Sequence, residues 1–284
     1  MTVLVTGAGG RLGRAVVAGF TDRGSGAEPV VGLDRLALDV ADQQAVHAAV
    51  RTHRPTVVVN CAAWTDVDGC EGDAARARRI NGGAVGHLRE AAEAVGAHLV
   101  QVSTDFVFDG RATEPYPENH PTGPLSVYGA SKLAGEVAAG PDATVVRTSW
   151  LQPADASGMV EYLLDALAGD GTVLMGDQRR ACPTFVADLV PVIVDLVDQR
   201  VAGTVHATNT GVTTWFEFAR HVAVATGCDP DRIEARSDPG LDGTSPAPRP
   251  EFSALDNGVL RSMGHPGLRH HLDAVAELVA GAGS

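Results

Sequence analysis

The stretch Val3-Leu-Val-Thr-Gly7-Ala-Gly-Gly10-Arg-Leu-Gly13 decides the fold that we predict for this chain of 284 residues. A short apolar run enters a G-x-x-G-x-x-G loop, and the loop opens a helical pattern over residues 11–20. Glycine permits the tight turn and a close approach to the backbone. Free N–H groups at the start of the helix then suit a dinucleotide pyrophosphate. The spacing alone is weak in a chain with 33 glycines, and an ordinary strand–helix turn is the alternative.

Short apolar runs alternate with longer helical patterns along most of the chain. We predict strands at residues 3–5, 29–33, 56–60, 98–103, 144–147, 172–175 and 203–207. We predict helices at residues 11–20, 43–52, 74–95, 127–138, 158–168 and 185–199. Continuous apolar strands separated by helices indicate an α/β fold with a doubly wound parallel sheet of the Rossmann type.

We expect two units within this fold. Residues 1–150 should form a dinucleotide-binding Rossmann domain, whose sheet continues in strands near 172–175 and 203–207. Residues 151–284 should form a smaller, interleaved substrate-binding lobe. The reason is that the strand–helix alternation loosens after Trp150, and residues 237–250 are rich in Gly, Pro and Ser.

The composition excludes several classes of partner. The chain has 22 Lys and Arg against 35 Asp and Glu, and a net charge of −13 opposes a nucleic-acid or anionic-membrane surface. The N-terminus lacks the pattern of a signal peptide, and the longest apolar stretch, 189–197, is too short to span a bilayer. Four cysteines without metal spacing indicate reduced thiols in a cytoplasmic protein. We expect the His270-His271 doublet to lie on the surface or in packing and not to bind metal.

The second predicted strand ends at Asp34, 21 residues after Gly13. A carboxylate at this place binds the adenine ribose hydroxyls of NAD. Arg35 follows directly and suits the 2′-phosphate of NADP, so NADH and NADPH both stay open. Asp39-Val40 either contacts the adenine or, through Asp39, caps a helix that begins near Ala41.

The only lysine among the 22 basic residues is Lys132, and Tyr128 stands four residues before it on a helical pattern. This spacing puts both side chains on one helix face. A tyrosine with its ordinary pKa of about 10 relays protons poorly at neutral pH, and a nearby cation should lower that pKa. A small ammonium also bonds ribose hydroxyls in a way that a planar guanidinium does not. Thr104 follows the strand at 98–103, where it either orients a substrate carbonyl or caps the next turn.

These motifs together resemble the extended short-chain dehydrogenase/reductases. Within that class the chain is similar to the dTDP-4-dehydrorhamnose reductase family over nearly its whole length. The finer motifs are Asn60-Cys-Ala-Ala-Trp-Thr-Asp-Val-Asp68, Val102-Ser-Thr-Asp-Phe-Val-Phe-Asp-Gly110, Val127-Tyr-Gly-Ala-Ser-Lys-Leu-Ala-Gly-Glu136, Arg147-Thr-Ser-Trp150, Asp177-Gln178, Pro183-Thr184, Trp215-Phe-Glu-Phe-Ala219, Arg249-Pro250 and Ser253-Ala-Leu255.

The resemblance implies reduction of the 4-keto group of a dTDP-4-keto-6-deoxyhexose by NADPH or NADH. Tyr128 is then the general acid, Lys132 tunes Tyr128 and holds the nicotinamide ribose, and Thr104 orients the carbonyl. Candidate substrate-binding residues are Thr104, Asp105 and Trp150. The candidate cofactor-binding residues are Gly7, Gly10, Arg11, Leu12, Gly13, Asp34, Arg35, Asp39, Val40, Ala62, Ala63, Trp64, Thr65, Val102, Tyr128 and Lys132.

The resemblance also implies a homodimer, formed through residues 74–95 and 127–138. Some family members bind Mg²⁺ at a subunit interface, but this sequence has no carboxylate cluster that supports such a site, so we predict no metal.

Three departures from the family pattern fall where the sugar nucleotide should bind. Leu151-Gln152 replaces a Val-Tyr pair, and Gly158-Met159 replaces an Asn-Phe pair. Four residues instead of three separate Gln178 from Pro183. The particular sugar therefore stays open. Arg179-Arg180, in that segment, is either a solvated surface pair or a clamp for a diphosphate.

Two other functions share parts of the pattern. Nucleotide-sugar epimerases and 4,6-dehydratases have the same glycine loop and Tyr-x-x-x-Lys, but such dehydratases place Glu after Thr-Asp, where this chain has Phe106. A non-catalytic NADP-binding role is known for the related regulatory subunit of methionine adenosyltransferase. That role does not require Thr104, Tyr128 and Lys132 together, and all three are present.

Overall fold

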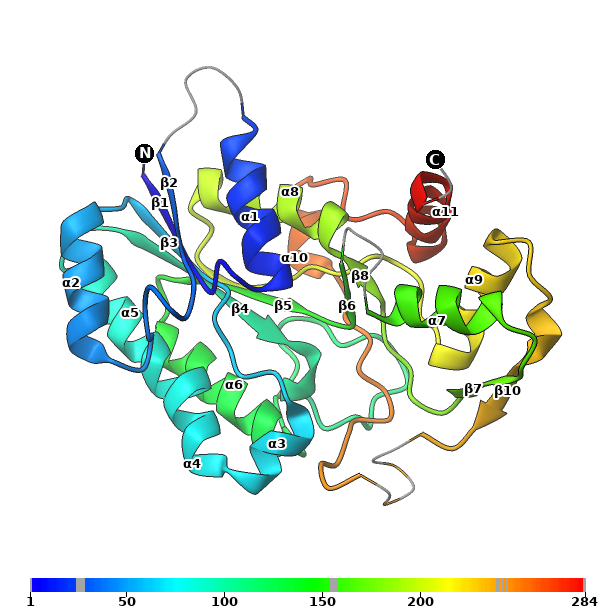
Figure 1. Cartoon of the computed structure of the whole chain (residues 1–284). Coiled ribbons are helices and arrows are strands. Elements are labelled where there is room, and N and C mark those ends of the chain that lie inside the picture. Colours follow the sequence, from blue (N-terminus) through cyan, green and yellow to red (C-terminus); the bar gives the residue numbers. More distant parts are fainter. Residues whose placement is uncertain are drawn as a thin grey trace.

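The main sheet of the computed structural model is parallel throughout (Figure 1). The structure describes residues 2–23, 29–153, 158–238, 241, 243 and 245–282. Within these residues six strands form the main sheet, in the order β2-β1-β3-β4-β5-β9. Their bounds are β1 Val3–Thr6, β2 Val30–Leu33, β3 Val57–Asn60, β4 His98–Thr104, β5 Thr144–Thr148 and β9 Gly203–His206. The order reverses direction between β1 and β3, and ligands bind at such a switch point in open α/β sheets.

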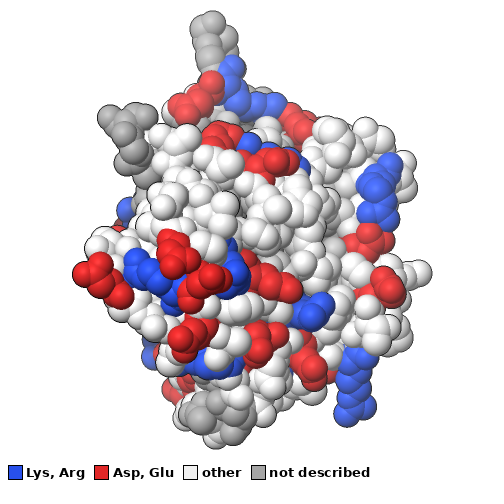
Figure 2. Space-filling model, turned by 90° about the vertical axis from the view of Figure 1, so that its right-hand side faces the viewer, with Lys and Arg blue, Asp and Glu red and all other residues white. Residues whose placement is uncertain are grey.

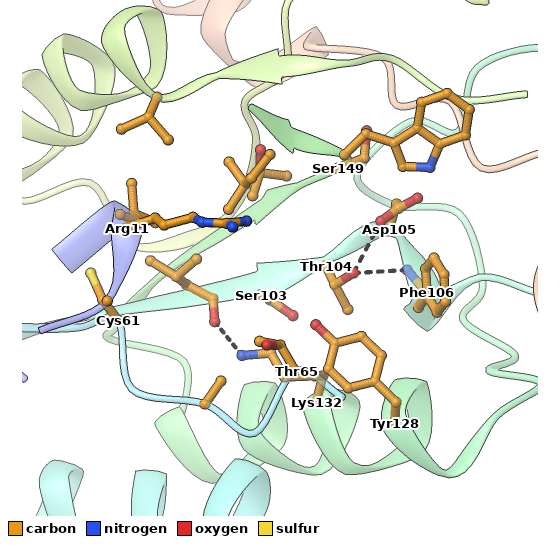
Figure 3. A pocket seen from close by; sticks show the side chains of 18 of the residues that line it. Arg11, Cys61, Thr65, Ser103, Thr104, Asp105, Phe106, Tyr128, Lys132 and Ser149 are labelled. Atoms are coloured by element: carbon orange, nitrogen blue, oxygen red, sulfur yellow. Dashed lines mark hydrogen bonds between the residues drawn. The ribbon is translucent and has the colours of Figure 1, made fainter. Parts of the chain in front are cut away.

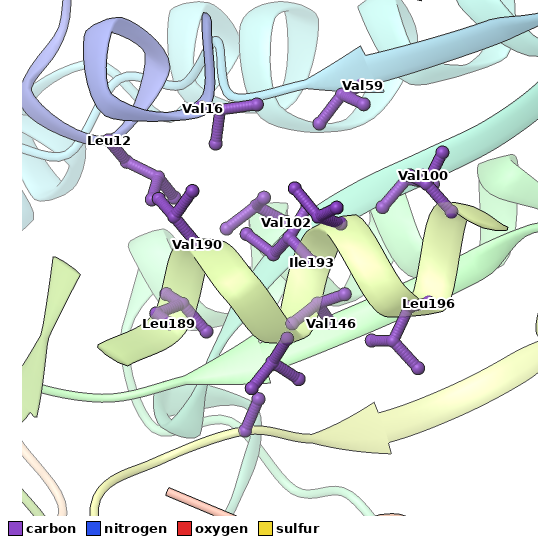
Figure 4. Close-up of a cluster of buried hydrophobic side chains, with 14 of the residues drawn as sticks. Leu12, Val16, Val59, Val100, Val102, Val146, Leu189, Val190, Ile193 and Leu196 are labelled. Atoms are coloured by element: carbon purple, nitrogen blue, oxygen red, sulfur yellow. The ribbon is translucent and has the colours of Figure 1, made fainter. Parts of the chain in front are cut away.

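Helices cover both faces of this sheet. One face packs against α1 (Arg11–Thr21) and α8 (Val186–Gln199), and the other against α2 (Gln43–His53), α5 (Ala84–Glu93) and α6 (Val127–Ala139). Figure 4 shows α8 lying across the strands of its face. Successive strand residues alternate between the two cores, because side chains of a strand point to opposite faces. The predicted doubly wound parallel sheet is confirmed.

A third core lies beside the main sheet. It is built from α7 (Met159–Ala168), β7 (Val173–Gly176), α9 (Trp215–Ala225), β10 (Ile233–Arg236) and α11 (His271–Ala282). The expectation that the strand near 172–175 continues the main sheet is wrong, because β7 pairs in parallel with β10 instead. The physical reason is that β7 has only one covered face. Leu174 is 48% exposed, whereas strands inside the main sheet are covered on both sides.

The helix expected at residues 74–95 is interrupted. It consists of α4 (Ala74–Ala77), a π-helical segment η1 (Arg78–Gly83) and α5. Within η1 the buried Asn81 amide bonds the backbone of Trp64 and the hydroxyl of Ser131. Wide turns of this kind occur often at functional sites. The remaining elements are α3 Val67–Gly72, η2 Asp105–Val107, β6 Leu151–Gln152, β8 Thr184–Phe185, η3 Pro230–Arg232 and α10 Gly258–Ser262.

Other features of the chain bear on partners. All four cysteines fall within the described residues and are free thiols. His271 is buried near Phe218 and His221, whereas His270 is exposed, so one histidine of the doublet lies in packing and the other on the surface. No helix in the described part of the chain is long and apolar enough to cross a membrane. Acidic and basic side chains are interspersed on the face shown in Figure 2.

Candidate functional site

A cavity of about 580 Å³ opens at the carboxyl ends of the central strands (Figure 3). Many residues selected from the sequence line it: Gly10, Arg11, Leu12, Gly13, Ala63, Thr65, Val102, Thr104, Asp105, Tyr128, Lys132 and Trp150. Further lining residues were not expected from the sequence: Cys61, Val67, Ser103, Phe106, Thr148, Ser149, Leu151, Pro153 and Val186. Several of these residues end or follow β3, β4 and β5. Ligands of such sheets bind at the carboxyl ends of the strands, so every residue at a predicted strand end was a candidate for the site.

Other predicted cofactor residues lie outside the cavity lining: Gly7, Asp34, Arg35, Asp39, Val40, Ala62 and Trp64. Asp34 accepts hydrogen bonds from the backbone N–H groups of Leu36 and Ala37, each at 2.9 Å. The exposed Arg35 follows it, and Val40 is buried in the core.

The alternative interpretation of Asp39 as a helix cap is wrong. The side chain of Asp39 accepts a hydrogen bond from Ala41, within the turn that precedes α2. The cap of α2 is Asp42, which accepts from the N–H of Ala45 at 3.1 Å. Two aspartates stand three residues apart, and the sequence pattern does not show which of them caps the helix.

The glycine loop fits a dinucleotide diphosphate. Gly7 has φ +68°, and a Cβ added to it would lie 2.6 Å from the backbone nitrogen of Ala62. A Cβ on Gly13 would lie 2.2 Å from the carbonyl oxygen of Gly7. The chain is therefore folded against itself too closely for any side chain at either position. Helix α1 starts after Gly10, which has no side chain to cap the helix, so no side-chain cap occupies the first N–H groups of α1, the groups that bind anions at such helix starts.

Helix α6 carries Tyr128 and Lys132 toward the cavity (Figure 3). Its start is secured from two sides. The Ser126 hydroxyl accepts from the N–H of Gly129 at 3.1 Å, and Glu71 accepts from the N–H of Val127 at 2.7 Å. Because both contacts hold the first turn of α6, they also set the position of Tyr128.

Lys132 is 4% exposed, and its Nζ donates to the carbonyl oxygen of Val102 at 2.6 Å. Burial lowers the pKa of Lys132 to about 8, and the carboxylate of Glu136 opposes this shift. The lysine is therefore an ammonium at neutral pH, and its hydrogen bond to Val102 holds it against β4.

The expectation that Lys132 lowers the pKa of Tyr128 is wrong, because this pKa is raised in the structure. Burial raises the pKa of Tyr128 above its usual value, the hydrogen bond with Thr104 lowers it, and the charge of Asp105 raises it further. The ring of Tyr128 also packs edge-on against Phe106, with centroids 5.7 Å apart. Tyr128 is therefore a protonated phenol at neutral pH, a state that can donate a proton.

Thr104 caps the next turn, and it also lines the cavity. Its Oγ1 accepts from the N–H of Phe106 at 3.2 Å and so caps the short helix η2. The same hydroxyl lies in the cavity beside Tyr128 and donates to Oδ1 of Asp105 at 3.0 Å. Ser253 donates to Oδ2 of Asp105 at 2.5 Å. Burial raises the pKa of Asp105 to about 6 despite these bonds.

A buried ion pair joins α6 to the main sheet. Glu136, one turn after Lys132, accepts from Nε and Nη2 of Arg147 at 2.9 and 2.7 Å. It also accepts from the hydroxyl of Ser103 at 2.5 Å. These bonds join α6 to β4 and β5. A bidentate pair of this kind has strict geometry, so it limits movement of α6 along the sheet.

Asn81 connects the cofactor side of the cavity with α6. Its Oδ1 accepts from the N–H of Trp64 at 2.8 Å, and its Nδ2 donates to the carbonyl of Trp64 at 3.0 Å and to the hydroxyl of Ser131 at 2.9 Å. Sequence reasoning missed this residue, because its partners lie 17 and 50 positions away in the chain.

Arg179 and Arg180 have different surroundings. Nε of Arg179 donates to Oδ1 of the buried Asp238 at 3.0 Å, and its backbone N–H donates to Oδ2 at 2.9 Å. The charge of Arg179 also lowers the pKa of Asp105. The interpretation as a solvated surface pair is wrong for Arg179, whereas Arg180 is exposed.

Among the described residues there is no group of three or more His, Cys, Asp and Glu that could hold a metal ion.

A doubly wound sheet, a glycine loop at the first strand–helix junction and a tyrosine–lysine pair in the same cavity define a protein of the short-chain dehydrogenase/reductase class. Comparison with known proteins places the chain within that class. The family model described as RmlD substrate binding domain matches residues 1–283, so the chain belongs to that family.

Individual relatives agree with this family. The chain is 43% identical over 283 residues to a dTDP-4-dehydrorhamnose reductase of Streptomyces griseus, covering 96% of this chain and 91% of that protein. It is 39% identical to a probable dTDP-4,6-dihydroxy-2-methyloxan-3-one 4-ketoreductase of Streptomyces antibioticus, over 98% of this chain and 94% of that protein. A crystal structure of dTDP-4-dehydrorhamnose reductase from Bacillus anthracis in complex with NADP is 30% identical, with a TM-score of 0.90, over 98% and 96% of the two chains. The family expected from the motifs is confirmed.

Proposed function

We propose that this protein is an NAD(P)H-dependent oxidoreductase that reduces the 4-keto group of a dTDP-4-keto-6-deoxyhexose. One observation carries the proposal. Thr104, Tyr128 and Lys132 line the same cavity as the first turn of α1, so a proton donor and a dinucleotide site share one space. The family relationship supports the same reaction, since the Streptomyces griseus relative is named a dTDP-4-dehydrorhamnose reductase.

Different residues of the chain perform different parts of a carbonyl reduction. When bound, a reduced nicotinamide supplies a hydride to the keto carbon. Arg11, Leu12 and Gly13 line the cavity at the start of α1, where their N–H groups would hold the diphosphate of the cofactor, and Lys132 would hold the ribose next to the nicotinamide. Val102, at the end of β4, orients Lys132 through its carbonyl oxygen.

Proton delivery falls to Tyr128. Because burial raises its pKa, its phenol is protonated at neutral pH and donates to the forming alkoxide. Thr104 turns its hydroxyl from Asp105 to the substrate oxygen and stabilises the developing negative charge. Once Tyr128 has donated its proton, it is a phenolate, and the ammonium of Lys132 stabilises this negative charge. A nearby cation therefore favours the loss of the proton at this step.

The choice between NADPH and NADH depends on Asp34 and Arg35 at the end of β2. One oxygen of Asp34 is occupied by two backbone N–H groups, and its other oxygen is the one that can accept from a ribose hydroxyl. Arg35 is exposed beside it and suits a 2′-phosphate. The Bacillus anthracis relative binds NADP. We propose that this chain accepts both cofactors.

The sugar is selected on the far side of the cavity from the glycine loop. We propose that Asp105 and Trp150 bind it there. In this proposal the smaller substrate-binding lobe is the part of residues 151–284 outside α8 and β9, since those two elements belong to the main sheet and its cover. Arg179 is the candidate for binding the nucleotide diphosphate. One relative is named a dTDP-4-dehydrorhamnose reductase and another a 4-ketoreductase of a different dTDP-sugar. The proposal therefore does not choose a single sugar as the substrate.

A reductase is favoured over a 4,6-dehydratase by Phe106. This residue lines the cavity and packs against the Tyr128 ring, at the place where those dehydratases carry an ionisable Glu. A phenyl ring transfers no proton, so water elimination lacks its acid. A purely regulatory role, in turn, gives no reason for a proton donor, a cation and a hydroxyl in one cavity.

The direct test follows the absorbance of NADPH and of NADH with purified protein and a panel of dTDP-4-keto-6-deoxyhexoses. We expect oxidation that depends on the sugar and yields the corresponding 4-hydroxy product. Absence of sugar-dependent oxidation across the panel would refute the reductase function, whether or not the cofactor binds.

We also propose a cytoplasmic homodimer. Val137, on the outer side of α6, is 76% exposed, which is unusual for an apolar side chain on a helix of the main domain. Sedimentation equilibrium of the wild type and of a Val137→Glu variant tests the interface. A monomer in the wild type would contradict it.

A further inference from the structure

Trp150 has a strained backbone. Its φ of +41° lies in the left-handed region, which bulky side chains rarely adopt. Its carbonyl oxygen is held on two sides, by the N–H of Thr184 at 3.2 Å and by Nε2 of Gln152 at 2.8 Å. Strain of this kind persists only where the surroundings determine the conformation, and it gathers at ligand-binding sites. These two hydrogen bonds hold the backbone of Trp150 in this conformation.

The indole of Trp150 lies flat against the indole of Trp215. The ring centroids are 3.9 Å apart and the planes differ by 7°. Trp215 belongs to a different part of the chain, where it begins α9 directly after the cap residue Thr214. The stack therefore joins the end of β5 to the third core.

Trp215 is itself held in place. Thr214 and Glu217 form a reciprocal capping box at the start of α9, with bonds of 3.0 Å in both directions. The ring of Trp215 packs edge-on against Phe218, with centroids 5.7 Å apart and an interplanar angle of 83°. Phe218 is fully buried. The platform under Trp150 is thus rigid.

The stack determines which part of Trp150 a ligand can reach. Since Trp215 covers one face of the Trp150 indole, only the opposite face and the ring edge remain for the cavity that Trp150 lines. A 6-deoxyhexose offers a methyl group and C–H bonds, an apolar surface that packs well on an aromatic ring. Resting on the function proposed above, we propose that Trp215 is a positioning residue, which fixes Trp150 as the platform for the sugar without touching the sugar itself.

The test compares Trp215→Leu, Trp215→Phe and the neighbouring Phe216→Leu as a matched control. Phe216 is on the same helix and packs against the same core, but it is outside the stack. We expect Trp215→Leu to raise KM for the nucleotide sugar about 2- to 10-fold, the range that the loss of an aromatic pair gives. The dissociation constant for NADPH should not change. Trp215→Phe should restore most of the affinity, and Phe216→Leu should behave as the wild type.

A thermodynamic cycle separates positioning from direct contact. If Trp215 acts through Trp150, Trp215→Leu should have no further effect on sugar binding in a Trp150→Ala background. An equal effect in both backgrounds would overturn the proposal, as would a Trp215→Leu variant that binds the sugar as tightly as the wild type. Equal losses of sugar and NADPH affinity would also overturn it, because they indicate general disruption.

The stack has a spectroscopic signature that does not need turnover. Two stacked indoles should give an exciton couplet in the far-ultraviolet circular dichroism spectrum, and Trp215→Phe should remove it. A wild type that shows the couplet but oxidises neither NADPH nor NADH with any sugar of the panel would refute the proposed function and leave the stack intact. A wild type that reduces the sugar but shows no couplet would refute the stack as the positioning device.

Discussion

Replacing Gly13 by alanine tests the close packing of the glycine loop. Gly13 is the third residue of α1, where alanine normally favours the helix over glycine by about 0.5–1 kcal/mol. Here the new Cβ would lie 2.2 Å from the Gly7 carbonyl oxygen, 2.8 Å from the Gly7 carbonyl carbon and 2.9 Å from Cα of Ala8. All three atoms belong to the backbone, so no side-chain rotation relieves the contact.

The matched control is Gly86→Ala. Gly86 is the third residue of α5, and a Cβ there meets nothing within 4 Å. The helix preference should therefore appear alone, and Gly86→Ala should stabilise the protein by about 0.5–1 kcal/mol. In Gly13→Ala the crowding costs about 1–3 kcal/mol and reverses the sign. The difference between the two variants equals the crowding cost, since the helix preference cancels.

Urea denaturation of both variants and the wild type measures these free energies. Titration with NADPH measures the second consequence. The loop must move away from α1 to admit the Cβ, so the dissociation constant should rise at least about tenfold in Gly13→Ala, a cost of about 1.4 kcal/mol. It should not change in Gly86→Ala. A Gly13→Ala variant as stable as Gly86→Ala, with wild-type affinity for NADPH, would refute the packing argument.

Four further substitutions address the chemistry. Tyr128→Phe should lower kcat by about 10²- to 10⁴-fold with an unchanged dissociation constant for NADPH, and retained turnover would exclude its role as acid. Lys132→Arg keeps the charge in a space filled by an ammonium 2.6 Å from the Val102 carbonyl, so most activity should be lost. In the wild type, kcat/KM should fall above about pH 8 as Lys132 loses its proton, and the residual activity of the arginine variant should lack that fall. The pKa of Asp105 is about 6 in the folded state, above the ordinary 3.8, so the folded state binds more protons and stability falls as pH rises from about 4 to 6. Asp105→Asn should therefore gain stability relative to the wild type between pH 4 and pH 7 in urea denaturation, and a constant difference would contradict this. Asp34→Ala should weaken NADH more than NADPH in binding titrations, and equal losses would show that the carboxylate does not read the 2′-hydroxyl.

The sequence by itself determined the features that depend on local order. Alternation of apolar strands with helices predicts a sheet covered on both faces, because the side-chain period of each element is a local property. The glycine loop and the Tyr128–Lys132 spacing are also local, since each needs only a few consecutive residues.

The tertiary structure alone decided the features that depend on distant partners. The strand at Val173–Gly176 reads like the others, but its partner is β10, some 60 positions later, and no local pattern identifies that pairing. The pKa of Tyr128 is governed by burial, which the whole fold creates, so a neighbouring lysine did not predict its direction. Arg179 resembles its exposed neighbour Arg180 in the sequence, and only the fold brings it to the buried Asp238. The stack of Trp150 on Trp215 depends likewise on two elements that meet only after folding. The physical reason is common to all four: periodicity records which face of an element is buried, but not what covers that face.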